Sequence, residues 1–250
     1  MSLEINGVSR RFGGLKAVSD VTMRIADGAI HSIIGPNGAG KTTLFNLVTG
    51  ALAPDAGRVS FQGQDITGWT PDRLARIGIA RTFQRTSIFK DLPVMENVAL
   101  AVRSRRGLNQ SLFCSSAAEA EIEDEARAIL AKVGLAGKER LKAGALAHGF
   151  QRALDIAIGL ALEPRIILMD EPLAGMSRGD RETVASLITA LRQDLGLTLV
   201  VVEHDVGMVM RLSDTITVMQ HGKVIAEGPP AMIREDEAVK KAYLHGSFAA

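Results

Sequence analysis

The clearest chemical signal in the sequence is a glycine-rich run, Gly35-Pro36-Asn37-Gly38-Ala39-Gly40-Lys41-Thr42, which is followed by Thr43. Its spacing is that of a phosphate-binding loop. The glycines let backbone N–H groups approach a phosphate without obstruction by Cβ atoms, and the helix that follows adds partial positive charge. The Lys41 ammonium can then reach the terminal phosphate oxygens, and the Thr42 hydroxyl can bind Mg²⁺. Residues 35–43 therefore predict a nucleotide-phosphate site.

A pair of carboxylates ends a later apolar run. Asp170 and Glu171 directly follow Ile166–Met169, which has the length and composition of a buried strand. Ligands of open α/β sheets bind at the carboxyl ends of the strands, so the pair is expected beside the phosphates. Asp170 is the candidate for holding Mg²⁺, and Glu171 for orienting or deprotonating an attacking water. Read alone, such a pair more often caps a helix, but the glycine-rich run upstream favours the catalytic interpretation.

A histidine follows another apolar run. His204 comes after the run 197–202, so a parallel sheet places it at the same edge as Asp170. It is a candidate contact for the terminal phosphate. The alternative is a surface histidine at a strand end.

Strand-length and helix-length patterns alternate around these residues. Strands are predicted at 3–8, 21–25, 29–34, 59–62, 79–83, 166–169, 197–202, 216–219 and 224–225. Helices are predicted at 41–49, 71–77, 94–102, 117–133, 150–162, 181–193 and 206–212. The alternation predicts an α/β fold whose largely parallel sheet is covered on both faces. The strand-free stretch from 94 to 133 predicts a helical subdomain.

Two charged runs lie within this subdomain. Arg103, Arg105 and Arg106 predict an exposed loop rather than a phosphate site. The acidic run over 119–125 predicts a solvated helix face rather than a metal site, and Ser116 is the expected cap of that helix.

Composition narrows the class of protein. The 250 residues carry 29 Lys and Arg against 28 Asp and Glu, with 4% aromatic residues, so neither a nucleic-acid partner nor an extended platform for stacking bases or sugars is expected. Cys114 is the single cysteine, and residues 1–11 lack the apolar core of a signal peptide, which predicts a reducing, cytosolic setting. No window approaches the roughly 20 apolar residues that span a bilayer. A membrane role is therefore expected to depend on a partner.

Further motifs complete a resemblance to ATP-binding-cassette (ABC) ATPases that covers essentially the whole chain. They are Gln84, the signature-like run Leu146-Ala147-His148-Gly149-Phe150-Gln151 and the run Gly175-Met176-Ser177. With the loop, the carboxylates and His204, they follow the family's order and spacing. The resemblance implies a P-loop NTPase cassette with a RecA-like core, an antiparallel β region and an inserted helical subdomain.

The resemblance implies a single domain over 1–250. Residues 1–88 and 160–227 form the expected ATP-binding core, 89–159 the helical signature subdomain and 228–250 a C-terminal helical tail.

The resemblance also implies ATP and Mg²⁺ as cofactors and assigns roles to the motifs. The implied catalytic residues are Lys41, Gln84, Glu171 and His204. The implied metal ligands are Thr42, Gln84 and Asp170. Phe12 is implied to stack on adenine, and residues 146–151 to bind the ATP of a facing subunit, because two cassettes of this family sandwich two ATP molecules.

Four positions depart from the residues usual in the family. Ala147 replaces Ser, His148 replaces Gly and Phe150 replaces Gln in the signature, and Ser177 replaces Asp in the run 175–177. A lost hydroxyl contact is worth about 1 kcal/mol, less than the backbone N–H groups that remain, so a working but asymmetric signature is expected. Ser177 is expected to affect communication between the two sites more than hydrolysis. The retained catalytic and metal residues argue against a non-hydrolysing cassette.

Four local runs resemble the cassettes that energise branched-chain amino-acid uptake: 12–18, 80–84, 96–98 and 242–244. Members of that group also import urea and short amides. The resemblance implies a peripheral subunit at the cytoplasmic face of the cell membrane, with a second ATPase subunit, identical or distinct, and two permease subunits. It further implies an extracytoplasmic solute-binding protein as an indirect partner. Residues 85–95 are the candidates for the permease contact.

Two other functions fit part of the sequence. The first is the ATPase of a lipopolysaccharide exporter, which has a similar length and a similar C-terminal end, although the run 80–84 favours the importer. The second is a soluble nucleotide-dependent switch or interaction module. The sequence has no Asn-Lys-x-Asp guanine-reading motif, and such a switch has no use for residues 146–151.

Overall fold

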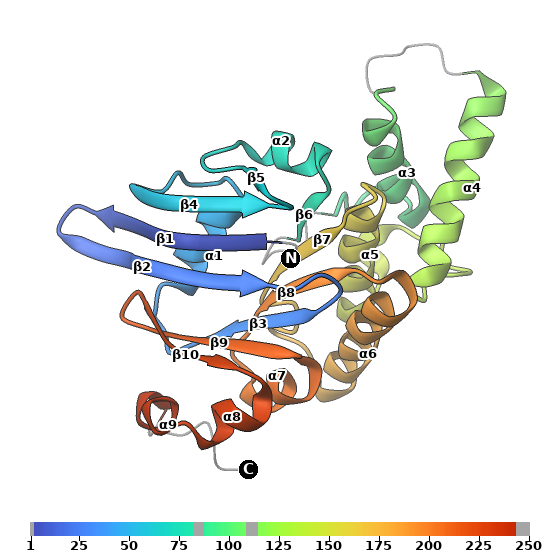
Figure 1. The fold of residues 1–250 in the computed structure, drawn as a ribbon. Coiled ribbons are helices and arrows are strands. Elements are labelled where there is room, and N and C mark those ends of the chain that lie inside the picture. The colour runs from blue at the N-terminus through green and yellow to red at the C-terminus, as the bar shows by residue number, and fades with distance from the viewer. Residues whose placement is uncertain (1–2, 83–87, 109–114, 244–250) are drawn as a thin grey trace.

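Two β-sheets and an arm of helices make up the fold (Figure 1). The structure is a computed structural model, and it describes residues 3–82, 88–108 and 115–243. One sheet has the strand order β2-β1-β4-β5, and the larger sheet has the order β10-β9-β3-β8-β7-β6. The non-sequential order of the larger sheet brings distant parts of the chain to one edge.

The larger sheet carries the ends that form the site. Its strands are β3 (Ile30–Ile34), β6 (Ile79–Thr82), β7 (Ile166–Asp170), β8 (Thr198–Val202), β9 (Thr215–Gln220) and β10 (Lys223–Gly228). Neighbouring strands run parallel except β10, which pairs antiparallel with β9. Strands β3, β7 and β8 are buried along their whole length, as their apolar runs predict. The predicted largely parallel sheet is confirmed.

Alternate residues of β7 face two different cores. Ile166 and Leu168 belong to a core that includes α1 (Lys41–Val48) and the antiparallel sheet. Ile167 and Met169 belong to a core that includes α5 (His148–Leu160) and α6 (Arg178–Leu195). The sheet is therefore covered on both faces, as predicted.

The antiparallel sheet is longer than its sequence pattern indicates. Its strands are β1 (Leu3–Phe12), β2 (Leu15–Ile25), β4 (Ala56–Phe61) and β5 (Gln64–Asp65). Strands β1 and β2 continue beyond the predicted segments to the Gly13-Gly14 turn. The sequence pattern missed this extension because residues 9–12 and 15–17 are exposed or half-buried and do not alternate.

The remaining helices form an arm beside the sheets and a C-terminal pair. The arm contains α3 (Val94–Arg105) and α4 (Ser116–Lys132), which pack on α5 (Figure 1). The shorter helices are α2 (Pro71–Arg76), α7 (Val206–Leu212), α8 (Pro230–Glu235) and α9 (Glu237–Tyr243). Among the helices of the described segments, none has both the length and the apolar character needed to cross a membrane.

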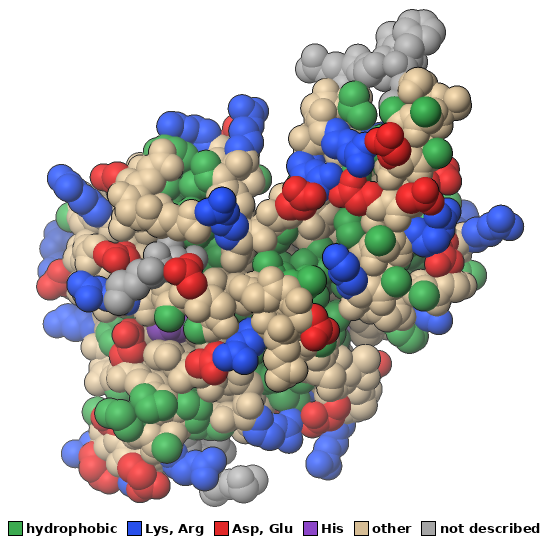
Figure 2. Space-filling view, turned by 45° about the vertical axis from the view of Figure 1, so that its right-hand side comes forward, with side chains coloured by type: hydrophobic (Ala, Val, Ile, Leu, Met, Phe, Trp, Pro, Cys, Tyr) green, Lys and Arg blue, Asp and Glu red, His purple; other side chains and the backbone are tan. Residues whose placement is uncertain are grey.

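The arginine run belongs to the end of α3 and not to a loop. Arg103 pairs with Glu119, while the Nη2 atoms of Arg105 and Arg106 lie 2.6 Å and 2.8 Å from the carboxylate oxygens of Glu125. The pairs join α3 to the acidic face of α4. Figure 2 shows basic and acidic side chains next to one another on this arm. The loop prediction was wrong because the compensating charges come from a different helix.

The cap of α4 lies one residue earlier than predicted. The Ser115 hydroxyl accepts the Ala118 N–H at 3.2 Å, whereas Ser116 is the first helical residue. The helix therefore begins as its acidic first turn predicts, with a serine cap.

A buried histidine in β3 couples the fold to pH. The His31 Nε2 lies 2.8 Å from the Thr217 hydroxyl, which donates in turn to Glu227. Burial lowers the pKa of His31 to about 4. In the unfolded chain the histidine binds a proton near pH 6.5. The contribution of neutral His31 to the free energy of unfolding is therefore fully present above that pH and is lost as the pH falls towards 4.

We expect His31 alone to lower the free energy of unfolding by about 2 kcal/mol between pH 7 and pH 5. The variant His31→Gln has no such titration, so its stability should fall less over the same interval. Urea unfolding of both proteins at the two pH values measures the difference. An equal fall in both proteins would show that His31 is not the source.

Candidate functional site

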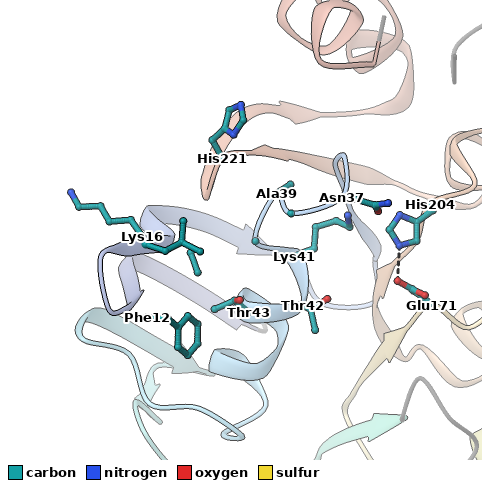
Figure 3. Close-up of a pocket in the computed structure, with 14 residues that line it drawn as sticks. Phe12, Lys16, Asn37, Ala39, Lys41, Thr42, Thr43, Glu171, His204 and His221 are labelled. Atoms are coloured by element: carbon teal, nitrogen blue, oxygen red, sulfur yellow. Dashed lines mark hydrogen bonds and ion pairs between the residues drawn. The ribbon is translucent and has the colours of Figure 1, made fainter. Parts of the chain in front are cut away.

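One cavity collects most of the residues predicted to do chemistry. It has a volume of about 450 Å³. Its lining comes from the β1–β2 hairpin (Phe12, Leu15, Lys16, Ala17), the glycine-rich run (37–43), the ends of β7 and β8 (Glu171, His204) and the β9–β10 turn (His221). In Figure 3, Phe12 lies at one end of the cavity, Glu171 and His204 at the other, and Lys41 between them.

Close neighbours explain two glycines of the loop. A Cβ atom on Gly35 would lie 2.2 Å from the Met219 carbonyl oxygen, and one on Gly40 would lie 2.3 Å from that of Ala17. Neither position has room for a side chain. The loop then enters α1 at Lys41, and the first turn of this helix lines the cavity. Its free N–H groups favour an anion there.

Lys41 presents a nearly buried cation to this cavity. The residue is 5% exposed, and its Nζ donates to the carbonyl oxygens of Gly35 at 2.7 Å and of Pro36 at 3.2 Å. Burial lowers the pKa of Lys41, while the negative charges of Glu171 and Asp170 act in the opposite direction. The arrangement suits a phosphate, because a bound anion adds a counter-charge where water is largely excluded.

The two adjacent carboxylates have different surroundings. Asp170 is 2% exposed, and within the described chain its Oδ1 is buried without a hydrogen-bond partner. Burial raises the pKa of Asp170, and the neighbouring charge of Glu171 adds to this effect. Glu171 has a left-handed backbone (φ 48°), and its Oε1 lies 2.5 Å from the His204 Nε2. The strand end thus gives one carboxylate to the interior and one to the cavity.

Glu203 supports this pair in a way that sequence reasoning missed. Its Oε1 accepts the Leu173 N–H at 2.7 Å, and its Oε2 accepts the His204 N–H at 3.0 Å. The carboxylate is 4% exposed, and burial raises its pKa. Glu203 therefore ties the loop after Glu171 to the end of β8. The available signal was a charged residue directly after a buried strand, the same signal that pointed to His204.

Four lining residues were not among the predicted site residues. Leu15, Lys16 and Ala17 belong to the part of the β1–β2 hairpin that the sequence pattern did not predict as strand, and His221 belongs to the β9–β10 turn. That turn is joined to the loop because the Gly222 N–H donates to the Ala39 carbonyl at 2.9 Å. Contacts between distant segments place these residues at the cavity.

The signature-like run lies outside the cavity, at the start of α5. Ala147 and His148 are exposed, whereas Gly149 is buried against Asp180. A Cβ atom on Gly149 would lie 2.9 Å from the Asp180 Oδ1. Ser177, the departure in the run 175–177, hydrogen-bonds the same Asp180: its hydroxyl donates to Oδ2 at 2.7 Å and accepts the N–H at 3.2 Å. The two runs are therefore adjacent in space.

The other predicted positions make local contacts or lie outside the described residues. Leu146 is buried and its carbonyl accepts the Gln151 Nε2 at 2.9 Å. The Phe150 ring has the Lys138 Nζ 4.8 Å from its centroid. Gln84 lies in the segment 83–87, outside the described residues.

Known families and proteins match this chain over most of its length. The family model described as "ABC transporter" matches residues 18–174, and the one described as "Branched-chain amino acid ATP-binding cassette transporter" matches residues 223–244. The chain is 40% identical to the high-affinity branched-chain amino acid transport ATP-binding protein BraF of Pseudomonas aeruginosa, over 97% of each chain. It is 38% identical to the corresponding protein LivG of Escherichia coli, also over 97% of each.

Solved structures agree with the sequence relatives. The ADP conformation of MJ1267, an ATP-binding cassette of an ABC transporter, has a TM-score of 0.86 at 30% identity, covering 98% of this chain and 99% of that one. A dimeric post-hydrolysis state of the ATP-binding cassette MJ0796 bound to ADP and Pi has a TM-score of 0.75 at 26% identity, covering 91% and 98%. The expected P-loop cassette fold is confirmed, and the chain belongs to the ABC transporter family of ATP-binding cassettes.

Proposed function

We propose that this chain is the ATP-hydrolysing subunit of an ABC importer for branched-chain amino acids or related small polar solutes. The observation that carries the proposal is the meeting of Lys41, Glu171 and His204 at one cavity behind a glycine loop. The transported class comes from the relatives BraF and LivG and from the match over 223–244. These relatives favour the importer over the lipopolysaccharide exporter.

In this proposal the cavity holds ATP along its length. The backbone of residues 37–43 and the Lys41 ammonium bind the phosphates, and Phe12 stacks on adenine at the other end (Figure 3). Phe12 is 46% exposed, and Arg10 supports its ring, with the guanidinium carbon 5.3 Å from the centroid. Asp55 fixes Arg10 through a contact of 2.8 Å. The ring is thus supported while its exposed surface remains available for a base.

The residues present fit a magnesium ion that accompanies ATP. The Thr42 hydroxyl and the Asp170 carboxylate are hard oxygen donors. The Oδ1 of Asp170 has no hydrogen-bond partner among the described residues, which suits a ligand or an acceptor from a metal-bound water. No group of three or more acidic, histidine or cysteine side chains that could hold a metal is found within 3–82, 88–108 and 115–243. Such a sparse set suits Mg²⁺, which takes much of its shell from phosphates and water. Gln84 is the third proposed ligand, and the ion neutralises phosphate charge when bound.

Hydrolysis in this proposal depends on the Glu171–His204 pair. Glu171 accepts a proton from the attacking water, and His204 orients Glu171 and contacts the terminal phosphate. The signature run 146–151 serves the ATP of a facing subunit, because it lies outside its own cavity. The cassette MJ0796, dimeric in a post-hydrolysis state bound to ADP and Pi, is a precedent for a dimer of cassettes that holds nucleotide.

The same proposal places the chain at the cytoplasmic face of a membrane, against two permease subunits that receive solute from an extracytoplasmic binding protein. The permease contact is the segment 85–95, of which residues 88–95 are described. Phe89 in this segment is 58% exposed. Asn97 fixes the Phe89 backbone, accepting its N–H at 2.7 Å and donating to its carbonyl at 3.1 Å. An exposed aromatic side chain on a fixed backbone suits protein docking.

Replacing the loop lysine should abolish ATP turnover. Lys41→Ala removes the cation that balances the phosphates, so we expect kcat/KM for ATP to fall at least about 100-fold. Lys132→Ala, an exposed lysine on α4, is the matched control and should retain turnover. Phosphate release measured with the purified transporter complex gives both values. Unchanged turnover in Lys41→Ala would contradict the proposed phosphate site.

Removing the proposed base should trap the ATP-bound dimer. Glu171→Gln keeps the side-chain shape but cannot take a proton, so ATP with Mg²⁺ should convert the variant into a dimer, which light scattering detects. ADP should leave it monomeric, and the double variant Lys41→Ala/Glu171→Gln is the control that should not dimerise. A monomer that persists in ATP, even with the second ATPase subunit added, would count against the sandwich.

Binding of ATP and of tripolyphosphate should distinguish the adenine end of the cavity from the phosphate end. Phe12→Ala should raise the Kd of ATP about tenfold, because a base–aromatic stack is worth about 1–3 kcal/mol, and should leave Mg²⁺–tripolyphosphate binding unchanged. Arg10→Met should act in the same direction but more weakly. Arg11→Met is the control, since the contact of Arg11 with Asp55 uses only its backbone. Calorimetric titration measures the Kd of each ligand. An equal loss of affinity for ATP and for tripolyphosphate in Phe12→Ala would contradict the stacking role.

A further inference from the structure

The Glu171–His204 pair needs support from the loops that carry it. Glu171 directly follows β7 and has a left-handed backbone, with φ of 48°. This conformation is costly for a residue with a side chain, so the surrounding structure must hold it. Its partner His204 has a side chain that is 43% exposed, so packing does not fix the imidazole (Figure 3). The geometry of the pair therefore depends on contacts made by the neighbouring residues.

The inner of two such contacts comes from Glu203, directly before His204. Its carboxylate accepts the His204 N–H at 3.0 Å and the Leu173 N–H at 2.7 Å. Leu173 lies two residues after Glu171, in the loop 172–177 between β7 and α6. The buried Glu203 carboxylate therefore ties the near end of this loop to His204.

The outer contact comes from Arg181 in the first turns of α6. Its Nε donates to the Met176 carbonyl at 3.2 Å, and its Nη1 donates to the Asp205 Oδ2 at 3.2 Å. Asp205 directly follows His204 and caps α7 with its other carboxylate oxygen. One guanidinium therefore ties the far end of the loop after Glu171 to the start of α7.

The outer contact closes a ring of residues around the pair. The ring passes from Glu171 along its loop to Met176, and returns through Arg181, Asp205 and His204. The side chains of Arg181 and Asp205 are 39% and 36% exposed, so their ion pair adds little to stability. Its effect is geometric, because the donors of a guanidinium lie in a rigid fork that holds two acceptors at a set separation.

We propose that Arg181 is a positioning residue for hydrolysis: it holds the loop 172–177 against the start of α7 and so sets the geometry of the Glu171–His204 pair. This inference rests on the proposed function, in which the pair acts on the attacking water. Arg181 is not among the residues that line the cavity. Its loss should therefore slow the chemical step, which depends on orientation, and leave ATP binding intact.

The variant Arg181→Met tests this role, because it keeps an unbranched side chain and removes the donors. We expect the single-turnover rate of phosphate release at saturating ATP to fall about tenfold in the purified transporter complex, with the half-saturating ATP concentration unchanged. Arg181→Lys keeps a charged donor and should recover part of the rate.

Arg211→Met is the matched control. Arg211 lies in the last turn of α7, and its Nη2 pairs with Glu182 of α6 at 2.7 Å. It joins the same two helices as Arg181 but at the end of α7 away from His204. The complex with Arg211→Met should release phosphate like the unmodified complex.

Asp205→Asn is an independent variant of the same contact. Its amide oxygen can still cap α7, but its NH₂ group cannot accept from Arg181. We expect the same fall in rate, and the double variant Arg181→Met/Asp205→Asn should be no slower than Arg181→Met alone, because both substitutions remove one contact. Additive losses would show that the two residues act separately and would overturn the proposal.

Other outcomes separate this inference from the proposed function. If Arg181→Met releases phosphate at the unmodified rate, Arg181 does not position the pair. If it raises the Kd of the non-hydrolysable analogue AMP-PNP as much as it lowers the rate, it acts on binding and the inference is overturned. If the unmodified complex and the Arg211→Met complex both fail to hydrolyse ATP, the proposed function itself fails, and this inference fails with it.

A measurement without turnover distinguishes positioning within the chain from a contact between subunits. ATP with Mg²⁺ should convert Arg181→Met/Glu171→Gln into a dimer at the same protein concentration as Glu171→Gln alone, because the contacts of Arg181 lie within one chain. Light scattering compares the two proteins. Loss of the dimer only when Arg181 is replaced would place this residue at the subunit interface and overturn the proposal.

Discussion

A lysine ammonium held almost out of water is the constraint on which the site depends. Burying a charge is costly unless oxygens surround it, and here the carbonyls of Gly35 and Pro36 do so, with two carboxylates nearby. The loop can offer those carbonyls only in one shape. That shape excludes side chains at Gly35 and Gly40, because β9 and the β1–β2 hairpin approach within van der Waals contact. The loop therefore needs both sheets.

The parallel sheet brings the acidic groups to the same edge. The register of β7 and β8 sets the end of each strand beside the other, so Asp170 pairs with Val202 and His204 follows two residues later. Arg152 of α5 donates to the Asp170 carbonyl at 3.1 Å and pairs with Asp155 at 3.1 Å. The helix that begins with the signature-like run is thus bound to the strand that carries the carboxylates. In the proposed ATP-driven dimer, this link would connect the surface that faces one nucleotide with the carboxylates that act on the other.

Segments from both ends of the chain enclose the loop. The N-terminal hairpin places the Ala17 carbonyl against Gly40, and the β9–β10 turn donates the Gly222 N–H to the Ala39 carbonyl. Each contact acts on backbone atoms of the loop and not on its side chains. Loop geometry is consequently a property of the whole chain, whereas the chemistry belongs to a few side chains.

The sequence by itself determined the elements that depend on neighbouring residues. The apolar runs before Gly35 and Asp170 predicted buried parallel strands, and the glycine spacing predicted the loop, because these signals act over a few residues. Only the tertiary structure decided the full length of the β1–β2 hairpin, the pairing of the α3 arginines with α4, and the position of His221 at the cavity. Those features depend on contacts between residues far apart in the chain. Such contacts produce no pattern within a short stretch of sequence, so the sequence does not predict them.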